Sequence, residues 1–556
     1  MRRALLAVAF LAGACGAPGP GASGGGSGSS GGGASTSGGG SGATGGGTGG
    51  GGGTGGAGGS GVHRITSLTC GPAMLQVAPG ATTGINAFAN FDDGTSVEVT
   101  GSVTWASSAA GIAQVMVTSA ADNEAVVQGV AEGSASVTAT TGTLTSSPCA
   151  VTVKAGPLPG LDGGTPPPAE ARAVWVTRFA YNSAAEVKTI ISNAKLAGFN
   201  LVYFQVRGNG DAYYKSTLAP WAKKLSGTLG KDPGWDPLQT AITEAHAKGL
   251  QLHAYWNVFA GWPVPAGCAT AGTCTCDPLP GKADSCALPE AAFAGSPEHY
   301  LHAHPEAMAV TSAGKSVDTE YYWLSPGDSA VRAHILAAAV EVMTNYEIDG
   351  LHLDRIRYPG QVYSYDPASN AAYAALPAPK PTREDWQRAN VTQMVGDIYA
   401  ALKQKRPKAM LSASVWGIYK ALPGCATSQG YVNYFQDSQG WIQAGKIDAL
   451  NPMIYWDIGT GCTDWAKLLD GFLANAGGRW IITGMHALDQ GKPRPERMAA
   501  RIAYARAHGA AGTTIFASTY LDLPTADGGS PTTWGTFSAP GGPYAADAGV
   551  PAMPWK

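Results

Sequence analysis

The stretch that decides the fold of this chain runs from Asp349 to Pro359 and has the sequence DGLHLDRIRYP. It is an apolar strand pattern interrupted by His352 and Asp354, and because these two stand two positions apart, their side chains point to the same side of a strand. Apolar stretches of similar length recur before and after it. We expect eight strands, at 173–177, 201–206, 250–256, 350–356, 410–415, 447–454, 480–483 and 513–517.

Helical patterns separate these strands, and most of them end just before a Gly or a Pro. We expect helices at 184–196, 237–248, 330–346, 383–405, 431–444, 464–474 and 495–508. Eight strands alternating with helices over residues 170–523 predict an α/β protein with a (β/α)8 TIM-like barrel. A doubly wound open sheet is the alternative, but no glycine-rich phosphate-binding turn follows the first strand, which disfavours a nucleotide-binding sheet.

Composition excludes several classes of protein. The 556 residues include 36 Lys+Arg and 39 Asp+Glu, a formal net charge of −3, so there is no basic field to attract a nucleic acid. Hydrophobic residues make up 44% of the chain, with 15 Trp and 21 Tyr, which suits a large core and excludes wholesale disorder. No stretch reaches the roughly 18 consecutive apolar residues of a transmembrane helix. We expect a monomer that binds no nucleic acid.

The first 15 residues have the pattern of a lipoprotein-type export signal. Arg2 and Arg3 precede an apolar run at 4–11, and small residues then lead to Cys15. This resembles a bacterial lipobox, in which Cys15 carries the lipid; ordinary cleavage without a lipid is the alternative. Residues 16–61 are almost entirely Gly, Ser, Thr and Ala and predict a disordered tether with a reach of about 35–40 Å. We therefore expect an exported lipoprotein of the bacterial cell envelope, held at a membrane by a lipid anchor at Cys15.

The other cysteines predict disulfides, because their number is even in a chain that we expect to be exported. They are Cys70, Cys149, Cys268, Cys274, Cys276, Cys286, Cys425 and Cys462. A zinc site at the four cysteines between 268 and 286 is the alternative, but their spacing fits no common zinc pattern. We expect no metal and no cofactor.

Residues 63–155 predict a small β-sandwich, because short β-branched runs alternate there with Gly, Asp and Asn turns. The segment resembles the bacterial Ig-like group 2 domains, most clearly at 104–108, 112–115 and 130–139. It contains no cluster of ionisable groups, so we expect a spacer or adhesion module. A Pro/Gly linker at 156–169 follows it, and a C-terminal extension at 524–556 is expected to pack on the barrel.

In a barrel, the residues at the carboxyl ends of the strands form the active site. Here they are unusually polar and aromatic, a combination that suits sugar rings and their hydroxyl groups. A buried salt bridge between Asp354 and Arg207 or Arg357, and metal ligation by three histidines, are the alternatives. The candidate substrate-binding residues are Gln205, Arg207, Asp211, Tyr213, His253, Tyr255, Asn257, His352, Arg357, Trp416, Asn451, Tyr455, Trp456 and His486.

The barrel region resembles the glycosyl-hydrolase-like 10 family. The matching segments lie in order from 170 to 555, at 170–176, 204–216, 220–221, 235–238, 245–250, 253–257, 324–327, 349–359 and 551–555. The resemblance implies a TIM-like barrel similar to those that hydrolyse glycosides. It also implies bacterial envelope glycans, peptidoglycan strands included, as the substrate class.

Glycoside hydrolysis usually requires two carboxyl groups that flank the scissile bond. Asp354 is the first choice, as the nucleophile or as the carboxylate that stabilises oxocarbenium-like charge. For the acid we favour Asp457 over the alternative Glu320. The prediction is an envelope-tethered glycoside hydrolase that acts on cell-envelope polysaccharide; a non-catalytic glycan-binding surface lipoprotein is the alternative. A second carboxyl group near Asp354 would favour the enzyme.

Overall fold

The structure is a computed structural model. It describes residues 64–555 except 72–73, 78, 81, 93–95, 120–123, 155–168, 265–277, 280–281, 287–296, 317–319, 490, 526–529 and 531. The export signal, Cys15 and the tether predicted at 16–61 therefore lie outside the described residues. In the part that is described, no helix is long and apolar enough to cross a membrane.

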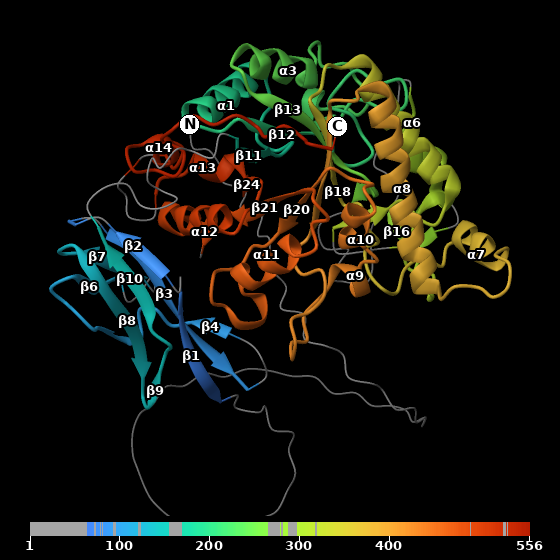
Figure 1. Cartoon of the computed structure of the whole chain (residues 1–556). Coiled ribbons are helices and arrows are strands. Elements are labelled where there is room, and N and C mark those ends of the chain that lie inside the picture. The colour runs from blue at the N-terminus through green and yellow to red at the C-terminus, as the bar shows by residue number, and fades with distance from the viewer. Residues whose placement is uncertain are drawn as a thin grey trace, which may run out of the picture. The chain divides into compact units, whose positions relative to one another are not determined.

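The N-terminal part is a sandwich of two sheets, as expected from its alternating pattern (Figure 1). Alternate residues of β8 are buried, and fully buried side chains from both sheets, such as Val127 and Val137, share one core. The disulfide between Cys70 and Cys149 joins β1 of one sheet to β10 of the other. One sheet contains β1 (Ile65–Gly71), β3 (Thr82–Phe91), β4 (Ser96–Glu98), β6 (Ala113–Ser119) and β7 (Glu124–Gly129), and the other contains β2 (Met74–Val77), β5 (Thr104–Ser107), β8 (Gly133–Thr141), β9 (Leu144–Thr145) and β10 (Cys149–Val153).

The larger part is a closed barrel of eight parallel strands, which confirms the predicted (β/α)8 fold and excludes the open sheet. The last strand pairs with the first, at Trp175 and Phe516, so no edge remains unpaired. The strands are β11 (Ala171–Val176), β12 (Leu201–Arg207), β13 (Gln251–Asn257), β18 (Gly350–Asp354), β19 (Met410–Trp416), β20 (Ala449–Met453), β21 (Trp480–His486) and β24 (Gly512–Phe516).

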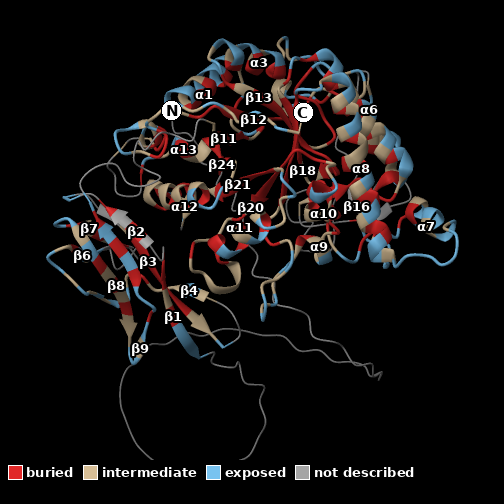
Figure 2. Ribbon diagram, in the orientation of Figure 1, coloured by how far each residue is buried: buried red, intermediate tan, exposed pale blue. Residues whose placement is uncertain are grey.

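Helices surround the barrel and present their outer faces to solvent (Figures 1 and 2). Those of the repeat are α1 (Ala184–Leu196), α3 (Pro237–Ala247), α6 (Ser329–Asn345), α8 (Arg383–Lys405), α10 (Ser438–Gln443), α11 (Trp465–Leu473) and α12 (Pro495–Ala507). Most begin where expected because a side chain caps them: Ser183 accepts from the Glu186 amide of α1 and Thr382 from the Asp385 amide of α8. Shorter helices are α2 (Lys223–Ser226), α5 (Tyr300–Ala303), α7 (Pro367–Ala374), α9 (Gly430–Asn433), α13 (Ser518–Leu521) and α14 (Gly535–Ser538).

The helix predicted over 431–444 is wrong in extent, because two short helices, α9 and α10, replace it. Phe435 has a left-handed backbone with φ 53°, which ends α9, and the Asp437 side chain accepts from the Gly440 amide to begin α10. The strand predicted to reach 356 ends at Asp354 for a similar reason, since Arg355 has φ 52°.

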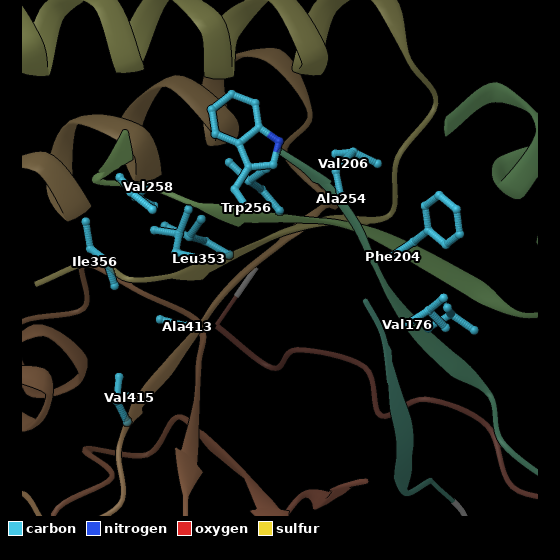
Figure 3. Close-up of a cluster of buried hydrophobic side chains, with 14 of the residues drawn as sticks. Val176, Phe204, Val206, Ala254, Trp256, Val258, Leu353, Ile356, Ala413 and Val415 are labelled. Carbon is cyan, nitrogen blue, oxygen red and sulfur yellow. The ribbon is translucent and has the colours of Figure 1, made fainter. Parts of the chain in front are cut away.

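The main core lies between the strands and the helices. Outward-facing side chains of neighbouring strands, among them Phe204, Trp256, Leu353 and Val415, form this layer and are fully buried (Figure 3). The C-terminal segment lies across the amino-terminal end of the barrel, where the Trp555 indole donates to Asp448 and the amide of Glu170 donates to the Gly549 carbonyl. The opposite end, where the strands terminate, is therefore the end left for a site.

The described residues also contain three small two-stranded antiparallel sheets. The pair β14 (Ala260–Pro263) and β17 (Tyr321–Trp323) lies in the long connection after β13, and matters for the site below. The others are β15 (Pro278–Leu279) with β16 (Lys282–Cys286), and β22 (Leu488–Asp489) with β23 (Lys492–Pro493).

Candidate active site

Asp354 ends β18 at the carboxyl end of the barrel, here called the mouth, and it is half-buried rather than sealed. Its Oδ1 accepts a hydrogen bond from the Arg355 amide at 2.6 Å, and its Oδ2 accepts one from the Tyr255 hydroxyl at 2.8 Å. Tyr255 comes from the neighbouring strand β13, and its pKa is raised well above the usual value by burial and by the Asp354 charge. The phenol therefore keeps its proton, and both oxygens of the carboxylate are held by donors.

Arg355 has a left-handed backbone, and its side chain reaches a second carboxyl group. The Arg355 guanidinium forms an ion pair with Glu320 at 2.6 Å and lies over the Tyr321 ring, 5.5 Å from its centroid. Burial lowers the pKa of Arg355, but the charges of Glu320 and Asp354 outweigh this effect and raise it. One guanidinium thus interacts with both carboxylates.

The antiparallel pair of strands β14 and β17 positions Glu320. The Val264 amide donates to the Glu320 carbonyl at 3.0 Å, and Tyr321 pairs with Pro263 in the next register position. The Glu320 side chain remains 37% exposed. A glutamate from the third connection is therefore held beside the carboxyl end of the fourth strand.

A layer of amide groups fixes the floor beside Tyr255. The Arg178 amide donates to Gln205 Oε1 at 2.9 Å, and Gln205 Nε2 donates to Asn257 Oδ1 at 3.2 Å. The Arg178 guanidinium also donates to the Tyr321 hydroxyl at 3.2 Å, which ties the first strand to the hairpin. Gln205 and Asn257 are at the mouth as predicted, but each is only 2% exposed and their amides serve mainly to hold the site.

Aromatic rings form the opposite side of the mouth. The Tyr455 ring lies 5.5 Å from His486 and 5.7 Å from Phe516, and His486 lies 5.1 Å from Tyr520. Burial raises the pKa of Tyr455, and the Asp354 charge adds to this effect, which places the phenol near that carboxylate. Burial lowers the pKa of His486, so it is a neutral ring that can contact a sugar.

Two more predicted residues lie near this end of the barrel. Trp416, at the end of β19, donates from its indole to the Ser428 carbonyl and contacts Tyr434 with ring centroids 4.3 Å apart. Trp456 is half-buried and packs against the main core. The Arg357 guanidinium lies among the rings of Trp416, Tyr434 and Trp323.

Three residues predicted to bind substrate are instead inside the barrel, below the mouth. His352 accepts from the Trp175 indole at 2.9 Å, contacts Ser412 at 2.8 Å and stacks on Tyr203; burial lowers its pKa well below the usual value. Asn451 donates to Tyr203. His352, Asn451 and His253 are each 0% exposed, so they support the mouth and cannot touch a sugar. The alternation of side chains along a strand predicts which of them point into the barrel, but not how close they lie to its carboxyl end.

Three others, at the end of β12 and in the connection after it, are also buried. Arg207 is 0% exposed and lies 5.5 Å from the Trp256 ring, in the layer outside the barrel. A register shift between Gln205 and Arg207 turns this side chain away from the interior. Asp211 accepts from the Asn209 amide, and Tyr213 is 2% exposed. None of the three is available to a substrate.

Asp457, favoured above as the acid, is held in a structural ion-pair network. Its carboxylate pairs with Arg497 at 2.8 Å and Arg501 at 2.7 Å, and also accepts from the Ile458 amide. Burial raises its pKa, but the two arginines outweigh this effect and lower it. A carboxylate that is ionised and doubly paired cannot supply a proton, so the structure favours Glu320 as the second group.

Among the described residues, one cluster of acids has the spacing of a metal site: Glu98, Asp457 and Asp489. Arg497, however, donates to all three carboxylates. The guanidinium supplies the positive charge that a metal would supply, so this cluster offers no vacant cation site.

The disulfide between Cys425 and Cys462 joins the connections that follow β19 and β20, and so braces this end of the barrel. The side chains of Cys268, Cys274, Cys276 and Cys286 lie outside the described residues, so their pairing stays a prediction.

Sequence reasoning missed Arg178, Tyr321, Trp323 and Tyr434. Arg178 could have been found, because it stands two residues after the end of the first strand. The others lie in long connections whose sequences contain no periodic signal.

Comparisons with known proteins show which family the sequence matches. The model of the glycosyl hydrolase-like 10 family matches residues 170–470. Glycosyl hydrolase YngK of Bacillus subtilis (strain 168) is 27% identical over 321 residues, which cover 54% of this chain and 57% of the relative. Glycosyl hydrolase DigH of Escherichia coli (strain K12) is 26% identical over 269 residues, 47% of this chain and 55% of the relative. The chain thus spans little more than half the length of these curated relatives.

Among solved structures, the glycoside hydrolase domain of PgaB (BpsB) from Bordetella bronchiseptica aligns with a TM-score of 0.45 and 14% sequence identity, covering 64% of this chain and 96% of that domain.

Proposed function

The chain belongs to the glycosyl hydrolase-like 10 family, as its sequence motifs indicated, and from this premise we propose that it is a glycoside hydrolase acting on bacterial cell-envelope polysaccharide. Peptidoglycan glycan strands are the substrate of first choice. The observation that supports the proposal is the arrangement at Arg355, whose amide donates to Asp354 and whose guanidinium pairs with Glu320. Glycoside hydrolysis usually requires two carboxyl groups, and both candidates lie at the same end of the barrel.

The two carboxyl groups have different surroundings and therefore different proposed roles. Asp354, with a donor on each oxygen, is the nucleophile or the carboxylate that stabilises the oxocarbenium-like charge. Glu320 is more exposed, and only its Oε2 is paired with Arg355. Once substrate displaces Arg355 from it, Glu320 is the group that would pass a proton to the leaving glycosidic oxygen as the bond to the anomeric carbon breaks.

The aromatic side of the mouth supplies the remaining contacts. Tyr455, His486 and Phe516 offer flat faces of low charge on the side of the mouth opposite Glu320. Sugar rings bind well to such faces, while Tyr255 and Arg355 keep the carboxylates in place.

The N-terminal features support a place at the cell envelope. The lipobox-like Cys15 and the Gly/Ser-rich segment 16–61 are those of a tethered lipoprotein, and the sandwich, with its resemblance to bacterial Ig-like group 2 domains, serves as a spacer. The working form in this proposal is a monomer anchored by lipid.

A glycan-binding lipoprotein without catalysis is the second candidate. The ion pair between Glu320 and Arg355 favours it, because a glutamate that stays paired holds no proton. Both candidates share the same binding residues and differ in whether fragments are released.

The test incubates the full chain with purified peptidoglycan glycan strands and measures released reducing ends. We expect Asp354→Asn and Glu320→Gln each to lower kcat at least about a hundredfold. Glu347→Gln is the matched control, since Glu347 also pairs with an arginine, Arg406, but is 79% exposed on the barrel's outside. If wild type and Asp354→Asn release fragments at the same rate, Asp354 is not catalytic. If the wild type binds the strands and releases nothing, the second candidate is correct.

A further inference from the structure

Arg357 is a buried arginine at the mouth that three aromatic rings enclose. Its guanidinium lies 4.7 Å from the Tyr434 ring, 5.1 Å from Trp323 and 5.6 Å from Trp416. The rings come from β17, from the end of β19 and from the connection after β19, and the Arg357 residue is 6% exposed. Such contacts fix the plane of the guanidinium and stabilise its charge.

The backbone around Arg357 is equally fixed. The Tyr358 amide donates to the Tyr434 carbonyl at 3.1 Å, and Gln436 Nε2 donates to the Ile356 carbonyl at 3.3 Å. Gln436 also accepts from the Trp416 amide at 2.7 Å. These contacts hold the segment against the end of β19, so the position of the arginine is determined before any ligand arrives.

The guanidinium has no acidic partner among the residues that the structure describes. Its Nη1 donates to the Tyr358 carbonyl at 3.3 Å, whereas Nε is buried without an acceptor. Several other buried arginines of the barrel pair with carboxylates, namely Arg172 with Glu170, and Arg497 and Arg501 with Asp457. Arg178, which is also buried at the mouth, donates instead to Gln205, Asn209 and the Tyr321 hydroxyl. A buried charge without a counter-ion is costly, and so its retention needs a reason.

The position of Arg357 at the site supplies that reason. Arg357 follows Asp354 by three residues and lies over Trp323 of β17, the strand whose Tyr321 lies under the Arg355 guanidinium, so the two arginines stand side by side at the mouth. Burial, and then the Arg355 charge, lower the pKa of Arg357, and the charges of Asp354 and Glu320 oppose this effect. Arg207 also lacks a hydrogen-bond partner, but it is 0% exposed and outside the barrel, where no substrate reaches it.

We infer that Arg357 binds a carboxylate carried by the glycan, and that the preferred substrate is therefore an acidic polysaccharide rather than a neutral one. This inference rests on the proposed function in taking the mouth as the sugar site. A planar guanidinium suits a carboxylate because it can donate two parallel hydrogen bonds to it. Arg355 cannot take this role, because Glu320 already occupies it.

The test compares two forms of one glycan. Purified peptidoglycan glycan strands carry a lactyl carboxylate on each muramic acid, and carbodiimide activation followed by borohydride reduction converts that carboxylate to an alcohol. Affinity is measured for the full chain carrying Asp354→Asn, so that no strand is cleaved, and kcat/KM is measured for the wild type. We expect the acidic strands to be favoured about ten- to hundredfold in both measurements.

Arg357→Gln should reduce this preference to nearly one and leave the affinity for the reduced strands unchanged. Arg383→Gln is the matched control: Arg383 also lies over three rings, those of Tyr365, Tyr373 and Trp386, but it begins α8 and donates to Asn370. It should keep the preference. Arg357→Lys, which retains the charge but not the paired donors, should show an intermediate preference and serves if the glutamine variant does not fold.

Equal affinity of the Asp354→Asn chain for both forms overturns the inference, and continued fragment release by the wild type then leaves the proposed function standing. A preference for the acidic strands that persists in Arg357→Gln also overturns the inference, because a group other than Arg357 must then bind the carboxylate. A preference that depends on Arg357 in a chain that cleaves nothing supports the inference and refutes the proposed function.

Discussion

Replacing Asp457 by asparagine separates a structural carboxylate from a catalytic one. Its side chain is 11% exposed and pairs with both Arg497 and Arg501. Asparagine keeps the shape but removes the charge, so Arg501 loses its ion pair, whereas Arg497 keeps those with Glu98 and Asp489. Loss of one partner of a buried ion pair costs about 3–5 kcal/mol. For a barrel of about 350 residues that cost corresponds to a fall in Tm of roughly 4–7 °C.

Glu320→Gln is the paired experiment and should show the opposite result. Glu320 is 37% exposed and has one ion pair near the surface, which contributes about 0–1 kcal/mol. Its replacement should leave Tm almost unchanged and remove fragment release. Asp457→Asn should lower Tm and leave kcat within about twofold of wild type when both are assayed well below their Tm.

The pH dependence of stability gives an independent check. The pKa of Asp457 is lower in the folded chain than its ordinary value, so its contribution is fully present above the ordinary pKa of about 3.9. That contribution is lost as the pH falls through the folded value. The difference in unfolding free energy between wild type and Asp457→Asn should therefore be constant near pH 7 and shrink below about pH 4. A variant that keeps its Tm but loses fragment release would refute the structural role.

Two further predictions follow from the same contacts. Tyr255→Phe removes the donor to Asp354 Oδ2 and should lower kcat about tenfold or more while circular dichroism stays that of the wild type, since only a hydroxyl is lost; unchanged kcat would show that this hydrogen bond is idle. Replacing Cys425 and Cys462 together by serine opens a link between positions 37 residues apart and should cost about 3–4 kcal/mol in chemical unfolding. Equal unfolding midpoints with and without the disulfide would contradict this.

The mouth combines fixed charge with flat apolar faces. Arg355 contacts Asp354 through its amide and Glu320 through its guanidinium, whereas Tyr455 and Phe516 contribute aromatic rings. Because Arg355 holds both carboxylates, substrate binding that displaces it from Glu320 would release that group to take a proton. The left-handed backbone at Arg355, uncommon outside glycine, is the local strain that makes this geometry possible.

Local pattern was sufficient for the architecture. The eight strands and helices such as 184–196 and 383–405 were found because burial on both faces gives a parallel strand an apolar run, and capping residues such as Ser183 mark helix starts. The same periodicity placed Asp354 near the carboxyl end of the fourth strand, although the strand predicted to reach 356 ends at Asp354 itself. Its neighbour Tyr255 could be predicted as well, since adjacent parallel strands end together.

The partners of Asp354 were decided only by the tertiary structure. From the chain alone we favoured Asp457 over Glu320 as the acid, and only folding brings two arginines of α12 to Asp457 and the strand pair β14–β17 to Glu320. Likewise, whether His352 reaches a substrate or fills the barrel depends on Trp175 and Tyr203, which come from other strands. Periodicity specifies the face of a strand on which a side chain lies, but depth and pairing arise from contacts between segments far apart in sequence, which no local pattern encodes.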